Sequence, residues 1–330
     1  MEIKKVIVIG ASAGGLKASV ALLEKIPQNL PVAIFVVIHL AKVSMPEIIL
    51  HQMQKVTTYK CKIPGNEEPI EAGNLYLAPA DKHLLIEKNT VRLIMGPHEN
   101  RWRPSIDVLF RSAAASYDSK VIGIILSGMM DDGTSGMSAI ERCGGTCIVQ
   151  EPQEAEYADM PLNVLNNVKE AHQVLIADMG YVIDDAIAKP VQHLPIPPDV
   201  KLEAEITARM VSSIPEMNQL GDYSDLSCPD CGGRLWKMHN EKVPRYRCHT
   251  GHVYLEHLLV QKQSENLEES IWISIRMMEE RRNMLLKMDA SGNNMTINAK
   301  TRADELAIHI DRLKDLLQSL GKISDDEGYL

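Results

Sequence analysis

The first half of the chain alternates uninterrupted apolar runs with amphipathic stretches. The runs contain no polar positions, which is typical of strands buried on both faces of a parallel sheet. They cover residues 6–9, 32–38 and 121–126, and more weakly 147–149 and 174–176. Leu16, Val20 and Leu23 form a helical stripe between the first two runs, and Pro27 ends it. Residues 1–187 are therefore predicted to form an α/β domain with a doubly wound, mostly parallel sheet.

A group of prolines marks the end of this domain. They are Pro190, Pro195, Pro197 and Pro198. Proline fixes φ and disfavours helix, so the sequence predicts a linker over residues 188–220. A compact segment with three cysteines follows and predicts a small zinc-ribbon-like unit over residues 221–257. Residues 258–330 have the pattern of a helical arm with a tail.

Two apolar stripes with helical spacing predict a helical hairpin in the arm. The first consists of Leu267, Ile271, Ile275, Met278 and Leu285. The second consists of Leu306, Ile310, Leu313 and Leu317. The first stripe extends further than a second helix over residues 298–320 can cover. We therefore expect the arm to mediate self-association or to dock on a signalling partner; the alternative is a cap folded onto residues 1–187.

The composition favours a cytoplasmic protein that binds neither nucleic acid nor membrane. The net charge of -9 argues against a protein that grips nucleic-acid phosphates. No apolar run approaches the roughly 20 residues of a membrane span. The first five residues lead directly into a strand, so no signal peptide is expected. Three of the six cysteines gather near His252 and the others are scattered, which favours reduced thiols over disulfides.

A G-x-S-x-G sequence at residues 10–14 follows the first predicted strand. Between a strand and a helix, its small residues allow a sharp turn that exposes the Ser12 hydroxyl. The following helix offers unpaired N–H groups where an oxyanion would form. Taken alone, the segment also fits a glycine-rich turn with Ser12 as a helix cap, or a phosphate cradle. A dinucleotide fingerprint fits less well, because it needs glycine at position 12.

Two further strand ends carry the groups that a serine nucleophile needs. His39 follows the run 32–38, and Asp131 and Asp132 lie shortly after the run 121–126. Parallel strands end at the same edge of a sheet, so these side chains can converge on Ser12. Serine needs a base, and the base needs a carboxylate that fixes its tautomer. We therefore predict a triad of Ser12, His39 and one of the two aspartates.

Several separated motifs of the chain resemble one family. They are IGASAGG (9–15), YLAPADKHL (76–84), RPSID (103–107), LSGMMDDG (126–133), QEP (150–152) and YADMP (157–161). Together they resemble the catalytic domain of the CheB-type chemotaxis protein-glutamate methylesterases, over residues 3 to about 183. The resemblance implies Ser12 as nucleophile, His39 as general base and Asp132 as the carboxylate. It also implies the Met129 backbone N–H as oxyanion donor, to which we add the Ala13 N–H.

The resemblance places a basic loop near the active site. Arg101 and Arg103 flank Trp102 in this loop, and the two cations would attract the acidic helices of a chemoreceptor. A solvated basic loop is the alternative interpretation. His83 and Asp107 belong to the matched motifs, and we assign them structural roles.

The chain departs from the family pattern at three places. Ala13 stands where the family often has threonine, which removes a hydroxyl from the site. His39 is followed by Leu40-Ala41-Lys42 instead of Met-Pro, so the substrate-facing loop is expected to differ. The position of Ser12 leaves no space for a preceding receiver domain, so control by phosphorylation in cis is expected to be lost.

Two short motifs near residue 240 predict a metal site. Cys228 and Cys231 form one knuckle, and Cys248 with His252 forms the other. Four such ligands suit a closed tetrahedral zinc site, in which the metal is structural and takes no part in catalysis. His249 is the rival for the fourth position. The ribbon resembles an extension found in some methylesterase-like proteins.

These patterns lead to one main function and two alternatives. The resemblance implies a serine hydrolase of signal transduction that demethylates glutamyl methyl esters on chemoreceptor-like proteins, and that also deamidates glutamine. The first alternative is a non-catalytic regulatory module, in which a degenerate methylesterase domain and a locally basic ribbon bind a partner protein or nucleic acid. Its basic residues are Arg234, Lys237, Lys242, Arg245 and Arg247. The second alternative is a small-molecule esterase, which would need a deep apolar pocket.

Overall fold

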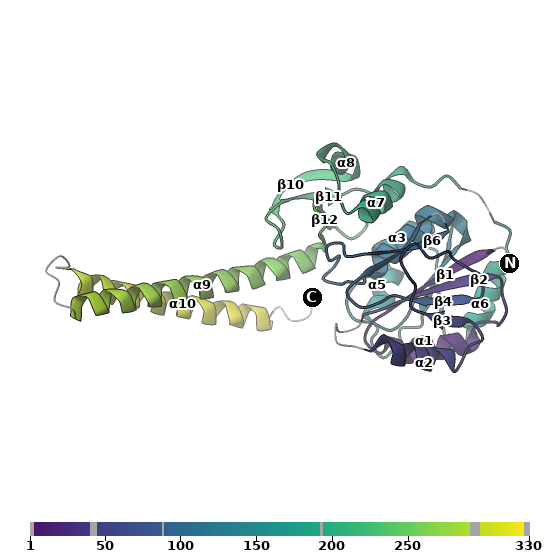
Figure 1. Cartoon of the computed structure of the whole chain (residues 1–330), viewed down its shortest axis with the longest axis horizontal. Coiled ribbons are helices and arrows are strands. Elements are labelled where there is room, and N and C mark those ends of the chain that lie inside the picture. Colours follow the sequence, from purple (N-terminus) through teal and green to yellow (C-terminus); the bar gives the residue numbers. More distant parts are fainter. Residues whose placement is uncertain (1–2, 40–44, 88, 192–193, 291–297, 327–330) are drawn as a thin grey trace. The chain divides into compact units, whose positions relative to one another are not determined.

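The computed structural model describes residues 3–39, 45–87, 89–191, 194–290 and 298–326 (Figure 1). The chain divides into two compact units, Met1–Glu256 and His257–Leu330. None of the helices in the described part of the chain combines the length and hydropathy that a bilayer crossing needs.

A seven-stranded parallel sheet forms the centre of the first unit. Its strands are β1 (Lys5–Ala11), β2 (Val32–Ile38), β3 (Lys60–Lys62), β4 (Asn74–Leu77), β7 (Val121–Ile125), β8 (Thr146–Gln150) and β9 (Ala171–Val174). They lie in the order β3-β4-β2-β1-β7-β8-β9 and all neighbours run parallel. The central strand β1 pairs with β2 on one side and β7 on the other, so the carboxyl ends of these three strands meet at one edge.

Helices cover both faces of the sheet because its strands are apolar on both sides. On one face lie α1 (Gly15–Lys25), α2 (Pro46–Gln54) and α6 (Ile176–Ala188), which pack with Ile7 and Ile9. On the other lie α3 (Ile106–Tyr117), α4 (Thr134–Arg142), α5 (Asp159–Asn167) and the hairpin of β5 (His83–Glu87) and β6 (Thr90–Ile94). Figure 1 shows α1 and α2 across the sheet from α3. A 3-10 turn, Asp118–Lys120, leads into β7. The expected doubly wound α/β fold is confirmed.

The elements predicted from the sequence differ from those in the structure at several short segments. The run 174–176 was expected to be a strand, but β9 ends at Val174 and Ile176 begins α6. Strands β3 to β6 have three to five residues each, too short for the apolar pattern to separate them from loops.

Residues 188–220, expected to be a linker, contain two helices. They are α7 (Pro198–Arg209) and α8 (Ile214–Leu220). Pro198 occupies the first turn of α7, where proline is tolerated because its missing N–H would have no intrahelical partner. Ile206 of α7 and Met217 of α8 pack with Trp236 in a small core. The prolines therefore begin a folded segment instead of a flexible one.

An antiparallel four-stranded sheet follows α8 and is called the ribbon below (residues 221–255). Its strands are β10 (Gly221–Ser227), β11 (Arg234–Met238), β12 (Arg245–Cys248) and β13 (Val253–Leu255), in that order. The ribbon belongs to the same compact unit as the seven-stranded sheet. The bridge between Glu99 and Val253 joins the two parts directly.

The second unit consists of two long helices, α9 (Glu256–Ala290) and α10 (Ala299–Asp326). Ile271 and Ile275 of α9 pack with Ile310 of α10, as the two stripes predict for a helical hairpin. Leu267 lies on the same stripe of α9 and remains 51% exposed. The last four residues of the expected tail, and residues 291–297 between the helices, lie outside the described residues.

Candidate active site

Three side chains meet at the edge of the sheet where β1, β2 and β7 end. Ser12 follows β1, His39 follows β2, and Asp132 lies at the start of the turn into α4. The Nδ1 atom of His39 is 3.2 Å from Ser12 Oγ, and its Nε2 atom is 2.9 Å from Asp132 Oδ2. The structure thus brings together the three residues predicted as a triad.

The two hydrogen bonds of His39 define its working tautomer. Asp132 is an ionised acceptor, so Nε2 carries the proton and donates it to the carboxylate. The lone pair of Nδ1 then faces the Ser12 hydroxyl and can accept its proton. The two ring nitrogens have roles opposite to those in the serine proteases, where Nε2 faces the nucleophile. The predicted roles of His39 as base and Asp132 as orienting carboxylate are unaffected by this exchange.

Asp132 is buried and held in its charged form by several donors. The Ile106 N–H donates to Oδ2 at 2.7 Å, and the Ser105 hydroxyl donates to Oδ1 at 2.9 Å. Burial by itself would raise the pKa of this carboxyl, but the hydrogen bond and charge of His39, with these two donors, hold the pKa below its usual value. The side chain of Asp131 instead accepts a hydrogen bond from Asn163. The hydrogen bonds therefore favour Asp132 over Asp131 as the carboxylate partner of His39, and this assignment stays a prediction.

The turn that carries Ser12 is fixed by the neighbouring strand end. The Ser12 N–H donates to the Ser127 carbonyl at 3.0 Å, and the Ser127 hydroxyl donates to the Ala13 carbonyl at 2.8 Å. Gly14 has φ 71°, which favours glycine. A Cβ at Gly128 would lie 2.9 Å from Ser12 Cβ, so this close approach needs glycine as well. The sequence pattern indicated the glycines but not the supporting role of Ser127.

Two backbone N–H groups beside Ser12 fit the expected oxyanion donors. Ala13 precedes the N-terminus of α1, and Met129 follows Gly128 at the end of β7. Neither N–H donates to another of the described residues. Both therefore remain predictions for the oxyanion site.

His83 and Asp107 support the triad without touching Ser12. His83 accepts the Ser105 N–H on Nδ1 and donates from Nε2 to the Pro97 carbonyl at 2.9 Å; burial lowers its pKa. Asp107 accepts the N–H groups of Gly133 and Gly136 at the start of α4. Burial and the nearby charge of Asp132 raise the pKa of Asp107 well above its usual value. The structural roles assigned to both residues stay predictions.

The basic loop contributes an aromatic ring that sequence reasoning missed. Trp102 stacks on the His39 imidazole with ring centroids 3.9 Å apart. Its neighbour Arg103 donates to Asp81 at 2.7 and 3.0 Å and to the Gly96 carbonyl at 2.8 Å, so this cation is already paired within the chain. Contact of Arg101 and Arg103 with substrate stays a prediction. In the sequence, Trp102 is notable only for its position between two arginines, and this position does not predict that its ring stacks on His39.

An open cavity of about 530 Å³ lies beside the triad. Ser12 and His39 line it together with apolar side chains of α1 and β2, among them Leu16, Val20 and Ile38. Ser12 is partly exposed towards it, as a nucleophile must be. The departure at residues 40–42, predicted to alter the substrate-facing loop, lies outside the described residues.

The predicted metal ligands converge in the ribbon. One ligand atom from each of Cys228, Cys231, Cys248 and His252 lies within 4.8 Å of the other three. The Sγ atoms of Cys231 and Cys248 are 3.8 Å apart, and Cys248 Sγ is 3.6 Å from His252 Nδ1. A tetrahedral zinc site with ordinary bond lengths requires separations of about 3.8 Å between sulfurs and about 3.6 Å between sulfur and nitrogen. The residues therefore fit zinc, and His252 rather than His249 lies with the cysteines.

The basic character expected of the ribbon is smaller than its sequence indicates. Arg245 and Arg247 are only 1% and 2% exposed. Arg245 pairs with Glu203 at 2.6 Å, and Arg247 pairs with Glu99 at 3.0 Å. Two of the five cations that the binding-module interpretation relied on are thus neutralised inside the protein.

Comparison with known proteins agrees with this geometry. The model of the family described as CheB methylesterase matches residues 7–183. A protein of Leptospira interrogans is 40% identical over 160 residues, which cover 48% of this chain and 82% of that protein. Proteins of Hydrogenovibrio crunogenus and Trichodesmium erythraeum, both named protein-glutamate methylesterase/protein-glutamine glutaminase, are 37% and 35% identical. The aligned regions cover 48% and 52% of this chain, and 42% and 49% of the two relatives, respectively.

A solved structure gives the same result for the fold. The crystal structure of the Thermotoga maritima CheB methylesterase catalytic domain matches with a TM-score of 0.51 and 28% sequence identity. The match covers 56% of this chain and 97% of that domain. The family match spans more than half of the chain and contains the whole Ser12, His39 and Asp132 arrangement. The chain therefore belongs to the CheB methylesterase family.

Proposed function

We propose that this chain is a serine hydrolase that demethylates glutamyl methyl esters on chemoreceptor-like signalling proteins. The observation that carries the proposal is the continuous hydrogen-bonded series from Ser12 Oγ through His39 to Asp132. We assign the chemistry to residues 1–187, within which all three side chains lie. The names of the relatives support the choice of substrate.

The mechanism follows from the positions of these side chains. His39 Nδ1 takes the proton of Ser12 as Oγ attacks the ester carbonyl, while Asp132 stabilises the imidazolium. The N–H groups of Ala13 and Met129 receive the oxyanion. Methanol leaves with the proton from His39, and an acyl-serine remains. His39 then activates water, which releases the glutamate carboxylate and restores Ser12.

The same machinery accounts for glutamine deamidation. A glutamine side chain passes through the same acyl-serine intermediate, with ammonia as the leaving group in place of methanol. The relatives' names combine the two activities. We propose deamidation as a second reaction of Ser12.

We propose a methyl-accepting chemoreceptor-like protein in the cytoplasm as the partner. The cavity beside Ser12 is open and is large enough to admit a side chain carried by another protein. The six cysteines form no disulfide bonds with one another, which suits a reducing compartment. Arg101 and Arg103 are proposed to lie near the receptor's acidic surface.

Methanol release from a methylated receptor signalling fragment tests the proposed function. We expect the full chain to release methanol in proportion to the glutamyl ester lost, and Ser12→Ala to release none. A chain that hydrolyses activated acetates but leaves the methylated receptor intact would be a small-molecule esterase. A chain that binds the receptor without cleaving either substrate would be a binding module.

We further propose that Cys228, Cys231, Cys248 and His252 hold a structural zinc ion. The donor set of three thiolates and one imidazole suits zinc, and four protein ligands leave no open position for catalysis. The ion would close the two knuckles and supply folding free energy to a sheet with a small core.

Metal analysis is expected to find about one zinc ion per chain. Cys248→Ser should lose most of it, because one of the four ligands is removed. Cys61→Ser, which changes a partly exposed thiol outside the cluster, should keep it. A metal-free preparation in which the three ribbon cysteines titrate rapidly with a thiol reagent would contradict the proposal.

The helical arm is proposed to mediate self-association. Besides the stripe that meets α10, helix α9 carries apolar side chains on roughly its opposite face. They are Ile273, Met277, Met284 and Met288, with exposures from 43% to 65%. A helix that is apolar on two faces needs a second surface to cover it. A second copy of the same face would supply one.

Charging this face is expected to separate the copies. Met277→Glu combined with Met284→Glu should convert an oligomer to a monomer, because each glutamate would be buried without a partner. Arg276→Glu, a charge change elsewhere on α9, serves as the control and should remain associated. Light scattering coupled to gel filtration measures the mass. A wild-type chain that runs as a monomer at high concentration would refute self-association.

A further inference from the structure

The indole ring of Trp102 covers one face of the His39 imidazole. The ring centroids are 3.9 Å apart and the planes are 7° from parallel. The hydrogen bonds to Ser12 and Asp132 hold the two nitrogens on the edge of the imidazole. They oppose movement of the ring within its own plane better than tilting of the ring out of that plane. A flat ring stacked at contact distance opposes the tilt. It would keep the base aligned while the proton is gained and lost.

Trp102 ends a tight turn that begins at Glu99, called the indole turn below (residues 99–102). The Trp102 N–H donates to the Glu99 carbonyl at 2.9 Å, and the Glu99 N–H donates back at 3.3 Å. Asn100 and Arg101 have φ 50° and 71°, the left-handed conformation of both central positions in a type I′ turn. Residues other than glycine keep this conformation where their surroundings hold them. The indole turn therefore depends on its contacts.

Strand β13 of the ribbon holds the indole turn through the backbone. The Asn100 N–H donates to the Val253 carbonyl at 2.9 Å, and the Val253 N–H donates to the His98 carbonyl at 3.4 Å. The Leu255 N–H donates to the side-chain oxygen of Asn100 at 3.3 Å. The side-chain amide of Asn100 donates to Asp107 of α3 at 3.0 Å. One residue of the turn thus joins the ribbon to the helix beneath the active site.

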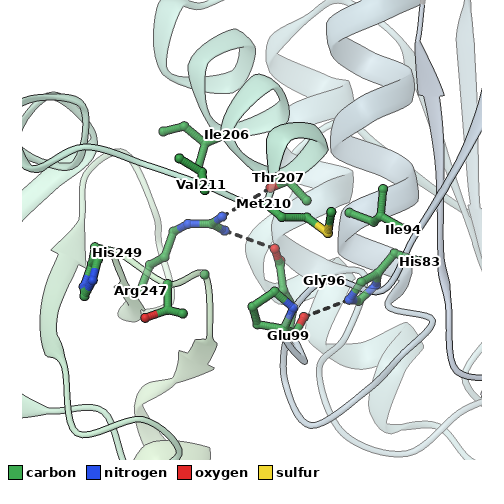
Figure 2. A pocket seen from close by; sticks show the side chains of 13 residues that line it. His83, Ile94, Gly96, Glu99, Ile206, Thr207, Met210, Val211, Arg247 and His249 are labelled. Atoms are coloured by element: carbon green, nitrogen blue, oxygen red, sulfur yellow. Dashed lines mark hydrogen bonds and ion pairs between the residues drawn. The ribbon is translucent and has the colours of Figure 1, made fainter.

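A buried charge network joins the same turn to strand β12. Glu99 pairs with Arg247 at 3.0 Å and with Arg111 of α3 at 3.2 Å. Glu203 of α7 pairs with Arg245 at 2.6 Å and with Arg247 at 3.4 Å. All five residues are at most 5% exposed, and Figure 2 shows Arg247 reaching from the ribbon to Glu99. Removing one partner from such a network leaves buried charge less well compensated, so loss of Arg247 would weaken the hold on Glu99.

The two ribbon residues that contact the indole turn, Arg247 and Val253, flank the predicted metal ligands Cys248 and His252. Arg247 directly precedes Cys248, and Val253 directly follows His252. A metal ion bound by these two ligands together with Cys228 and Cys231 would fix the spacing between Arg247 and Val253. The metal site lies outside the chemistry, but its segment is in contact with the turn that carries Trp102.

We propose that Trp102 is a positioning residue for His39, and that the ribbon keeps Trp102 in place by holding the indole turn. The inference rests on the proposed acyl transfer at Ser12, because only a working base has to be held. It gives the ribbon a function: damage to its contacts with the turn lowers the rate at Ser12 and leaves substrate affinity unchanged.

Removing the indole tests the first part. Trp102→Ala is expected to lower kcat for an activated ester, and the rate of fluorophosphonate labelling of Ser12, by about 10-fold with KM unchanged. Trp102→Phe keeps a flat ring against His39 and should recover most of both rates. If Trp102 served only the fold, Trp102→Ala would reduce the amount of folded enzyme but not the rate per labelled site.

A double-mutant cycle tests the second part. Arg247→Met removes the pair with Glu99 and is expected to lower both rates by about fivefold through misplacement of the indole. Arg234→Met removes an arginine of the same sheet that lies over the Tyr223 ring, and should match wild type. In a Trp102→Ala background, Arg247→Met should have no further effect, because no indole remains to be placed. Effects that multiply, or equal effects of the two arginine changes, would overturn the proposal.

Circular dichroism and thermal unfolding check that the variants fold. If Arg247→Met does not fold, Arg247→Lys takes its place in the cycle, because lysine keeps the charge and loses the forked geometry. A wild-type chain that is not labelled at Ser12 would defeat the proposed function, and this inference with it. Wild-type labelling together with an unchanged rate in Trp102→Ala would defeat this inference alone.

Discussion

Replacing Ser12 by alanine is expected to lower kcat for ester hydrolysis by about 10⁴-fold or more, because no other group can form the acyl intermediate. His39→Ala should be nearly as severe, since base and nucleophile act as a unit. Combining the two should add little to either change alone. Release of the alcohol from an activated ester, measured at saturating substrate, gives the rates.

The fold should survive both changes. Ser12 is partly exposed, and its backbone N–H, not its side chain, makes the bond to Ser127. The thermal unfolding midpoint of Ser12→Ala should therefore stay close to that of wild type. A Ser12→Ala enzyme that is fully folded and keeps a tenth or more of its activity would show that the nucleophile lies elsewhere.

Asp132→Asn is expected to lower kcat by roughly 10³- to 10⁴-fold while Asp131→Asn has little effect. The asparagine would donate an amide hydrogen towards His39 Nε2 and so favour the tautomer that carries its proton on Nδ1. That tautomer cannot accept the Ser12 proton. The side chain of Asp131 accepts a hydrogen bond from Asn163.

The two neighbouring aspartates form a matched pair, because the chemical change is the same and the positions differ by one residue. Both variants are compared with wild type by kcat and by the fluorophosphonate labelling rate of Ser12. A large loss in Asp131→Asn together with a small one in Asp132→Asn would reverse the assignment of the carboxylate.

The parts of the fold that the sequence predicts are those in which one strong pattern dominates. The runs at 6–9, 32–38 and 121–126 are apolar at every position because β1, β2 and β7 are buried between two layers of helices. The carboxyl ends of these strands could be placed at one edge from topology alone. Ser12 and His39, which follow two of the strands, could therefore be predicted to lie together. The choice of Asp132 over Asp131 needed the family resemblance, because it depends on the backbone at the start of α4.

The parts that the sequence could not predict depend on long-range pairing. Glu99, Glu203 and Arg247 are charged residues in three separate segments, and charge by itself predicts exposure. Their burial follows only from their mutual contact, which the structure shows and no local pattern encodes. The stacking of Trp102 on His39 likewise depends on a turn held from outside its own segment.

The most direct test of the central claim is fluorophosphonate labelling of the full chain, followed by peptide mapping and assay on a methylated receptor fragment. The reagent transfers its phosphonyl group to an activated serine oxygen and releases fluoride. We expect one phosphonyl group per chain, on the peptide that contains Ser12, with methanol release falling in proportion to the labelled fraction. Labelling at another residue, or a fully labelled chain that still releases methanol from the receptor, would contradict it.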